Sequence, residues 1–188
     1  MRRPAHRDVA TLAAAIALAS GLSVPVAPAR SASGNGPVLA EATPQEVVSA
    51  VVMKLAGFVE WPVSSGTGYG VCVYDDGPLA ALLESYQGRP AREAVVLVRR
   101  VTLAAAVTGC HVAFVGSEGP RRLESVAEAY RGRPVLIVAE GEDAIDRGAM
   151  VGLSVSGGRI VFDVDRTAAS RERVEVSSKL LRLARRVK

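Results

Sequence analysis

Histidine, cysteine and aromatic residues are scarce in this sequence, and their scarcity limits the chemistry that it can support. The 188 residues include two histidines, two cysteines and one tryptophan. One histidine, His111, lies beyond the N-terminal leader, which leaves little scope for a histidine base. Cys72, Cys110 and His111 lack the paired spacing of a structural zinc site, and adjacent strand residues point to opposite faces. We therefore expect neither a metal ion nor a cofactor.

Motifs of nucleotide and acyl chemistry are missing as well. No Gly-Lys-Ser or Gly-Lys-Thr phosphate loop occurs, and the glycines of 66–70 precede an apolar run instead of following one. The segment 152–156 lacks the final glycine of a nucleophile elbow. The sequence therefore predicts a protein that is not an enzyme.

The charge of the chain argues against nucleic acid as a partner. The formal net charge is +4, and half of this excess comes from three arginines and one aspartate in residues 1–29. Beyond them, residues 30–165 carry 12 basic and 16 acidic side chains, whereas residues 166–188 carry 8 and 2. A basic tail therefore follows a mildly acidic body, and a nucleic-acid partner is not expected.

The N-terminus has the pattern of an export signal. Three arginines in the first seven residues precede an apolar run over 9–26, which leads into Ala27-Pro28-Ala29. We predict a signal peptide over 1–29 that is cleaved near Ala29, a disordered leader over 30–42 and one domain over 43–188. An uncleaved membrane anchor is the alternative, but glycine and proline interrupt the run, which is short for the ~20 residues of a spanning helix.

Export favours a disulfide between Cys72 and Cys110, since exported proteins reach oxidising compartments. In the chain-entropy model, closing a loop of this length restricts the unfolded chain by about 4 kcal/mol. Two buried free thiols on neighbouring strands are the alternative.

Apolar periodicity predicts alternating helices and strands. Thr43-Pro44-Gln45-Glu46 has the pattern of a capped helix start, and apolar residues continue at helical spacing until Trp61-Pro62 ends the helix. We predict further helices over 76–86 and 120–131, a helical turn over 102–107, and strands over 69–74, 94–99, 110–115 and 134–139. Alternation of this kind predicts an α/β fold with a mixed, mostly parallel sheet flanked by helices on both faces.

The pattern changes near the C-terminus. Two apolar runs, 149–155 and 159–164, flank Ser156-Gly157-Gly158, which predicts a late β-hairpin. Leucines alternate with arginines and lysine over 177–187, which predicts a C-terminal amphipathic helix with a basic face.

Four segments taken in order resemble one protein family. They are Lys54–Pro62, Gly109–Val115, Gly148–Met150 with Gly158–Asp165, and Val176–Ala184. The most specific parts are Phe-x-Glu-Trp-Pro at 58–62 and Ser-Ser-x-Leu-Leu at 177–181. From about residue 45 to its end, the chain resembles the YfiR family of exported proteins.

This resemblance implies a periplasmic repressor that binds the periplasmic sensor domain of an inner-membrane diguanylate cyclase, or a related sensor. Such a repressor lowers cyclic di-GMP signalling and biofilm formation, and the family implies a homodimer. Cys72 and Cys110 stand where the family has cysteines. A second pair found in some members would fall near Ile145 and Gly152, so that bridge is missing and redox switching is in doubt.

The resemblance also implies a partner-binding surface on the late hairpin and the segment after it. The corresponding residues are Val151, Asp163, Ala169, Lys179, Leu180, Leu181 and Arg182. The alternative for the last four is a helix packed on its own sheet with solvated cations. An alternative function is a periplasmic small-ligand-binding protein, suggested by the alternating strands and by Trp61 at a helix end.

Overall fold

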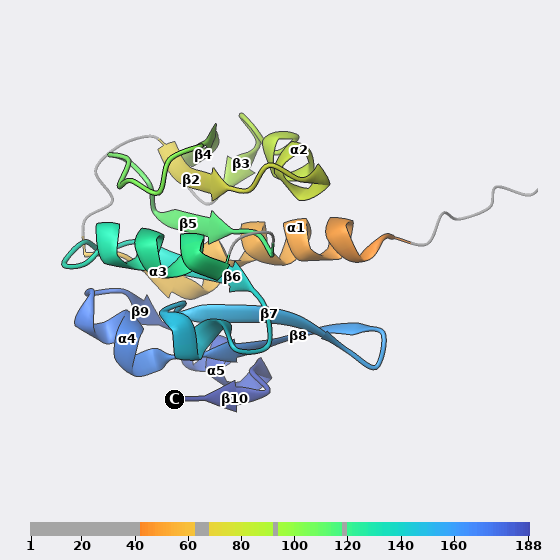
Figure 1. The fold of residues 1–188 in the computed structure, drawn as a ribbon, viewed down its shortest axis with the longest axis vertical. Helices are drawn as coiled ribbons and strands as arrows, with labels where there is room; N and C mark the ends of the chain where they lie inside the picture. Colours follow the sequence, from red (N-terminus) through yellow and green to blue (C-terminus); the bar gives the residue numbers. More distant parts are fainter. Residues whose placement is uncertain (1–41, 63–67, 92–93, 118–119) are drawn as a thin grey trace, which may run out of the picture. The chain divides into compact units, whose positions relative to one another are not determined.

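A mixed eight-stranded sheet runs through the part of the chain that the structure describes (Figure 1). The computed structural model describes residues 42–62, 68–91, 94–117 and 120–188. The predicted signal peptide, and all but the last residue of the predicted leader, lie outside these ranges. The division into signal peptide, leader and one domain therefore stays a prediction.

The sheet has the strand order β10-β8-β7-β6-β5-β2-β4-β3. Its strands are β2 (Gly68–Tyr74), β3 (Pro90–Ala91), β4 (Ala94–Arg100), β5 (Val112–Val115), β6 (Leu136–Glu140), β7 (Val151–Ser156), β8 (Arg159–Val164) and β10 (Arg186–Val187). Neighbouring strands run parallel, except that β3 is antiparallel to β4 and β7 is antiparallel to β8. The predicted fold class, with its mostly parallel sheet and late hairpin, is confirmed.

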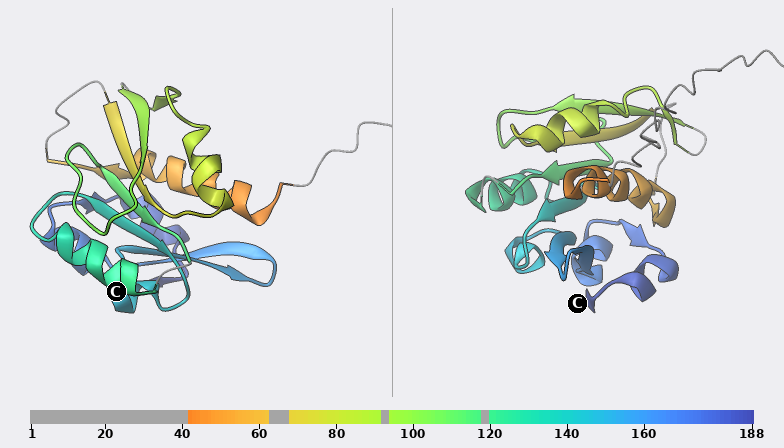
Figure 2. Two further views of the ribbon diagram at one scale, coloured as in Figure 1. Left: turned by 45° about the horizontal axis from the view of Figure 1, so that its top comes forward. Right: turned by 90° about the vertical axis from the view of Figure 1, so that its right-hand side faces the viewer.

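Helices cover both faces of this sheet. The helices are α1 (Pro44–Leu55), α2 (Pro78–Glu84), α3 (Pro120–Ala129), α4 (Arg166–Arg171) and α5 (Ser178–Leu183), with 3-10 turns η1 (Ala56–Phe58) and η2 (Ala144–Arg147). Helices α1 and α3 lie on opposite sides of the strands (Figure 2). Among the described residues, no helix combines the length and apolar character required to cross a membrane.

The core lies in the middle strands. Every residue of β5 and the first four of β6 are buried, as expected for strands covered on both faces. Val71 and Val73 of β2 are also fully buried. The continuous apolar runs in the sequence therefore reflect two-sided burial.

Two local signals act as predicted. The Glu46 carboxylate accepts a hydrogen bond from the Thr43 amide at 2.7 Å, and the Thr43 hydroxyl oxygen accepts one from the Glu46 amide at 3.3 Å. This reciprocal capping box starts α1. In the β7–β8 hairpin, Gly157 and Gly158 both have positive φ angles, of 56° and 75°, as a type I′ turn requires.

The first helix is shorter than predicted. It ends at Leu55, and after η1 the chain enters β1 (Val59–Glu60), which pairs antiparallel with β9 (Glu175–Val176) in a separate two-stranded sheet. Val59 is fully buried in this pairing. The apolar spacing that predicted a longer helix therefore serves a strand whose partner lies more than a hundred residues away.

The predicted helical turn over 102–107 is wrong, because bends occupy this segment. Its backbone groups are bound by tyrosine side chains instead: Ala105 O accepts from Tyr74 and Val107 N–H donates to Tyr130. Tertiary hydrogen bonds have replaced the local ones that a helix would make.

The C-terminal helix is also shorter than the predicted 177–187. Helix α5 stops at Leu183, and the following residues form β10 at the edge of the sheet. The Arg185 and Lys188 amides donate to Phe162 O and Val164 O, both at 2.8 Å. The residues after Leu183 therefore pair with β8 instead of continuing the helix.

Candidate functional site

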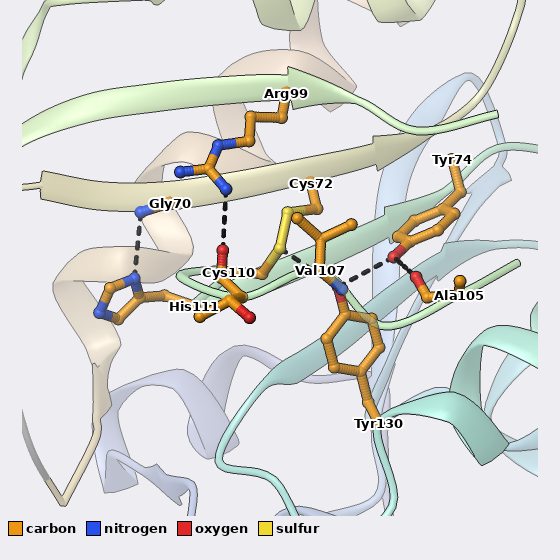
Figure 3. The surroundings of a disulfide bond; sticks show 10 residues. Gly70, Cys72, Tyr74, Arg99, Ala105, Val107, Cys110, His111 and Tyr130 are labelled. Carbon is orange, nitrogen blue, oxygen red and sulfur yellow. Dashed lines mark hydrogen bonds between the residues drawn. A yellow bond between two sulfur atoms is a disulfide. The ribbon is translucent and has the colours of Figure 1, made fainter. Parts of the chain in front are cut away.

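The predicted disulfide between Cys72 and Cys110 is present (Figure 3). Cys72 lies in β2 and Cys110 lies just before β5, with their Cα atoms 5.7 Å apart. Both residues are buried. The bridge therefore ties the start of β5 to the middle of a neighbouring core strand.

Two buried tyrosines fix the crossover segment 101–110 beside this bridge (Figure 3). The Tyr74 hydroxyl donates to Ala105 O at 2.6 Å, so Tyr130 supplies the proton of the 2.9 Å bond between the two hydroxyls. The Tyr130 oxygen lies 3.2 Å from Cys110 Sγ. Burial raises the pKa of Tyr74 well above its ordinary value, so its hydroxyl stays neutral and acts as a hydrogen-bonding group.

His111 is used in the same region as a backbone acceptor. Its Nδ1 accepts from the Gly70 amide at 3.0 Å, and its ring centroid lies 5.6 Å from those of Trp61 and Tyr69. Burial lowers the pKa of His111, which keeps the ring neutral. A Cβ at Gly70 would clash with the Gly109 carbonyl oxygen, so the crossover segment passes directly over Gly70.

Two acidic side chains lie at the opposite, carboxyl end of the central strands. Asp75 follows β2, and Glu140 at the end of β6 accepts from the Ser117 amide at 3.2 Å. Burial raises the pKa of Glu140, and the charge of Asp75 raises it further. Ligands of α/β sheets often bind at this edge. His111 lies at the amino end of β5, so it cannot form an acid–base pair with these carboxyls.

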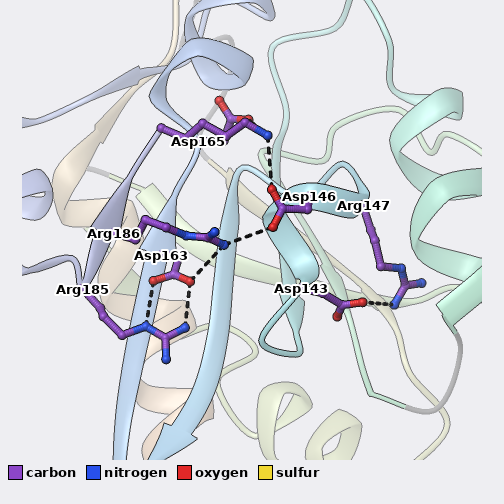
Figure 4. Close-up of polar contacts among 8 residues, drawn as sticks. Asp143, Asp146, Arg147, Asp163, Asp165, Arg185 and Arg186 are labelled. Carbon is purple, nitrogen blue, oxygen red and sulfur yellow. Dashed lines mark hydrogen bonds and ion pairs between the residues drawn. The ribbon is translucent and has the colours of Figure 1, made fainter.

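The basic tail is bound to the acidic part of the chain. Asp163 of β8 is only 2% exposed, and its carboxylate accepts two hydrogen bonds from Arg185, at 3.0 and 2.8 Å (Figure 4). The Arg186 guanidinium lies 3.5 Å from the same carboxylate. The hydrogen bonds from Arg185 lower the pKa of Asp163, so its carboxyl is ionised.

Asp146 of η2 extends this arrangement. Its carboxylate binds Arg186 and Lys188, each at 3.2 Å, and the Lys188 contact is the main reason why the pKa of Asp146 is lowered. Longer contacts join Arg185 to Glu142 at 3.7 Å and Lys188 to Asp165 at 3.9 Å. We call these seven residues the tail network: Glu142, Asp146, Asp163, Asp165, Arg185, Arg186 and Lys188.

The tail network unites features that the sequence presents separately. The acidic turn near residue 143 and the basic residues after 184 lie some 40 positions apart. The opposite charge balance of body and tail is the one signal in the sequence that points to their association. Pairing between them leaves less of the basic tail free for a partner than its composition suggests.

The predicted partner-binding residues differ in accessibility. Val151 and Ala169 are fully buried, and Asp163 and Leu180 are 2% and 3% exposed. Lys179 and Arg182 are exposed and Leu181 is half-buried. Direct contact with a partner is therefore open to the last three residues, whereas the buried four can act by supporting the surface above them. The assignment as a whole stays a prediction.

A cavity of about 640 Å³ opens between α3, η2 and α4. Ile137, Ile145 and Met150, all buried, form an apolar part of its wall, and charged residues of both signs complete it. Trp61, on which the ligand-binding alternative was based, lies with Tyr69 and His111 instead. In the described ranges, no group of three or more histidine, cysteine or acidic side chains is arranged to hold a metal ion.

Comparison with known proteins identifies a structure with a similar fold and the family of this chain. A solved structure described as a conserved domain protein from Vibrio cholerae O1 biovar El Tor aligns with a TM-score of 0.53 at 14% identity, covering 79% of this chain. The chain spans 61% of that protein's length, and at this identity the likeness shows the fold alone. The model of the YfiR/HmsC-like family matches residues 45–185. This chain therefore belongs to the YfiR/HmsC-like family.

Proposed function

We propose that this protein is a periplasmic regulator that binds the sensor domain of an inner-membrane diguanylate cyclase and holds the enzyme inactive. The family match over residues 45–185 is the observation that carries the proposal. The buried Cys72–Cys110 bridge supports it, because disulfides persist in oxidising compartments. By this route the protein lowers cyclic di-GMP signalling and biofilm formation.

Such a regulator needs no catalytic residues of its own. A protein outside the inner membrane has no access to cyclic di-GMP, so it must act through a partner that crosses the membrane. Binding the inactive form of that partner more tightly than the active form is enough to shift the equilibrium. A homodimer, as the family resemblance implies, would present two such binding surfaces.

The outer side of α5 is the surface we propose for first contact. Lys179 and Arg182 are exposed there, and Leu183 has an exposed fraction of 67%. Leu180 packs inward at 3% exposure and anchors the helix. Cations beside an exposed leucine suit an acidic partner surface with an apolar centre.

Co-purification with the periplasmic domains of membrane-bound diguanylate cyclases from the same organism tests the proposal. We expect the mature protein to retain the sensor's periplasmic domain. The double variant Lys179→Glu, Arg182→Glu should bind it about tenfold more weakly or worse, because charge reversal at an interface is unfavourable. Lys54→Glu with Arg133→Glu, an equal charge change on exposed residues elsewhere, is the matched control. Unchanged cyclic di-GMP after deletion of the gene would count against the regulatory role.

The cavity favours a second candidate function, in which the protein binds a small periplasmic ligand and reports it to a membrane sensor. Its volume of about 640 Å³ is within the range of small-molecule sites, and its wall combines apolar and charged groups. A thermal-shift screen against periplasmic metabolites tests this function. A compound that binds there should shift the melting temperature of wild type but not of an Ile145→Trp variant, which narrows the cavity. No shift of wild type with any compound would remove this function.

A further inference from the structure

Strand β10 adds to the sheet with little apolar burial. All four residues from 185 to 188 are exposed, and Val187, the apolar residue of the strand, has an exposed fraction of 47%. Backbone bonds from the Arg185 and Lys188 amides join it to β8. Buried apolar surface, the main stabilising contribution for the inner strands, is therefore small at this edge.

The Arg166 and Thr167 amides of α4 also donate to Lys188 O, at 2.9 and 3.3 Å, and the side chains of the tail add charge contacts. Arg185, Arg186 and Lys188 contact carboxylates from two other elements, Asp163 of β8 and Asp146 of η2. The cations are between 38% and 56% exposed. Ion pairs between exposed groups weaken as salt rises, since the screening length falls from about 10 Å at 0.1 M to about 3 Å at 1 M.

Departure of the tail would leave unsatisfied groups on β8. The Phe162 and Val164 carbonyls would lose their donors, and Asp163, which is almost fully buried, would lose both of its cations. Without the tail, water would have to solvate these carbonyls and the Asp163 carboxylate in place of the protein's own donors and cations. A replacement strand that supplies both backbone donors and positive charge would restore the lost interactions.

We propose that residues 184–188 form a releasable strand, and that the β8 edge beneath it is a docking site for an extended basic segment of the partner sensor. The identity of the partner rests on the proposed function, whereas the release of the tail does not. Addition of a strand to a sheet edge is a general mode of peptide recognition.

The present register defines the segment that fits. Arg186 lies opposite Asp163 and Val187 lies opposite Val164, in parallel orientation. Arg185 precedes this pair and Lys188 follows it, so two bases, an apolar residue and a base occupy successive positions. A partner segment with this order of residues would reproduce both the hydrogen bonds and the ion pairs.

Hydrogen exchange of the whole mature protein tests the release. Between about 50 mM and about 1 M NaCl, we expect exchange at the Arg185 and Lys188 amides to accelerate several-fold, while core amides such as Val138 stay unchanged. Arg185→Gln, Arg186→Gln and Lys188→Gln together should give the fast exchange already at low salt. The matched control removes three exposed arginines elsewhere, Arg133, Arg159 and Arg171. Tail amides that exchange equally slowly in all these cases would overturn the proposal.

A synthetic peptide with the sequence of residues 180–188 tests the docking edge. Fluorescence anisotropy should show it binding the triple glutamine variant at least about tenfold more tightly than wild type, whose own tail competes at a high effective concentration. A peptide with glutamine at its three final basic positions should not bind. Equal binding of both peptides, or no binding to the variant, would contradict a charge-matched strand site.

The sensor domain separates this inference from the proposed function. If the sensor binds wild type and the triple variant equally and leaves tail exchange unchanged, the docking site is wrong while the regulatory role stands. If the peptide binds as expected and no sensor domain does, the docking site stands and the regulatory role fails.

Discussion

His111 shows how one half-buried side chain couples protonation to stability. Its Nδ1 can accept the Gly70 amide proton only in the neutral ring, because both nitrogens of the protonated ring carry hydrogens. The ring also lies beside Trp61 and Tyr69, with its centroid 5.6 Å from each of theirs. Protonation therefore breaks a hydrogen bond and places a charge in a half-buried site, where desolvation disfavours it.

We predict that the mature protein loses stability as the pH falls from about 6.5, the ordinary histidine pKa in an unfolded chain. Since the pKa of His111 is lowered in the fold, the unfolded chain binds the proton first, and stability declines until the pH reaches the lower folded value. Urea denaturation at a series of pH values measures the effect. Fluorescence of Trp61, the single tryptophan, reports it locally.

His111→Asn is the matched variant for this prediction. The asparagine oxygen can replace Nδ1 as the acceptor for Gly70, but it does not titrate between pH 5 and pH 8. The decline in stability over that range should therefore flatten in the variant. An unchanged slope would assign the pH dependence to other groups.

At the scale of elements, the sequence predicts those whose signals are local. The capping box of Thr43 and Glu46 and the turn at Gly157 and Gly158 lie within four residues of the structure they specify. Strands β1, β9 and β10 are two residues each and exist through pairing with distant strands. No periodicity can appear in so short a segment, so these elements could not be read from the sequence.

The same distinction applies to the candidate site. The cysteine pair was predictable because two cysteines in a chain with a predicted export signal allow a single intramolecular bridge. The tail network was not predictable from the sequence, because contacts such as that of Arg186 with Asp146 join residues 40 positions apart. The sequence did not predict helix α4, although Asp165 caps it by accepting from the Ala168 amide. The helix is short and has no clear apolar stripe, so its periodicity is too weak to detect.

Asp165 gives a prediction for α4, the helix that carries Ala169. Its Oδ1 accepts from the Ala168 amide at 2.7 Å, and the side chain also contacts Lys188. We expect Asp165→Ala to lower the free energy of unfolding by about 1 kcal/mol, the usual loss for removal of a helix cap. Asp165→Asn keeps the acceptor and should lose clearly less. Equal losses in denaturant titrations, with equally fast exchange of the Ala168 amide, would show that the cap contributes nothing.

At the scale of the molecule, the disulfide divides the sheet into two parts. The loop that it closes spans 38 positions and contains α2, β3 and β4, together with the crossover segment 101–110. The tail network and α5 lie beyond β5, on the other side of the bridge. Loss of the bridge should therefore loosen the β2–β4–β3 edge before it affects the proposed partner surface.

Replacement of Cys72 and Cys110 by alanine tests this division. In the chain-entropy model, a loop of 38 positions stabilises the fold by about 4 kcal/mol, which is an upper value because residual structure in the unfolded chain reduces the effect. We expect denaturant titrations to show a loss of about 2 to 4 kcal/mol. Hydrogen exchange should accelerate most in β4 and least in β7 and β8. Peptide mapping without reductant should show the two cysteines linked in the wild type.

Binding of the sensor domain decides whether the two parts are also functionally separate. Below its lowered melting temperature, the double alanine variant keeps α5, Asp163 and the tail in place, so its affinity should stay within about threefold of wild type, or less than 1 kcal/mol. Tyr130→Phe is a useful companion, because it weakens the crossover and leaves the bridge intact. A large loss of affinity in either variant at low temperature would mean that the crossover side of the sheet contributes directly to partner binding. Retained affinity together with fast exchange in β4 would locate the regulatory surface in the C-terminal half of the sheet.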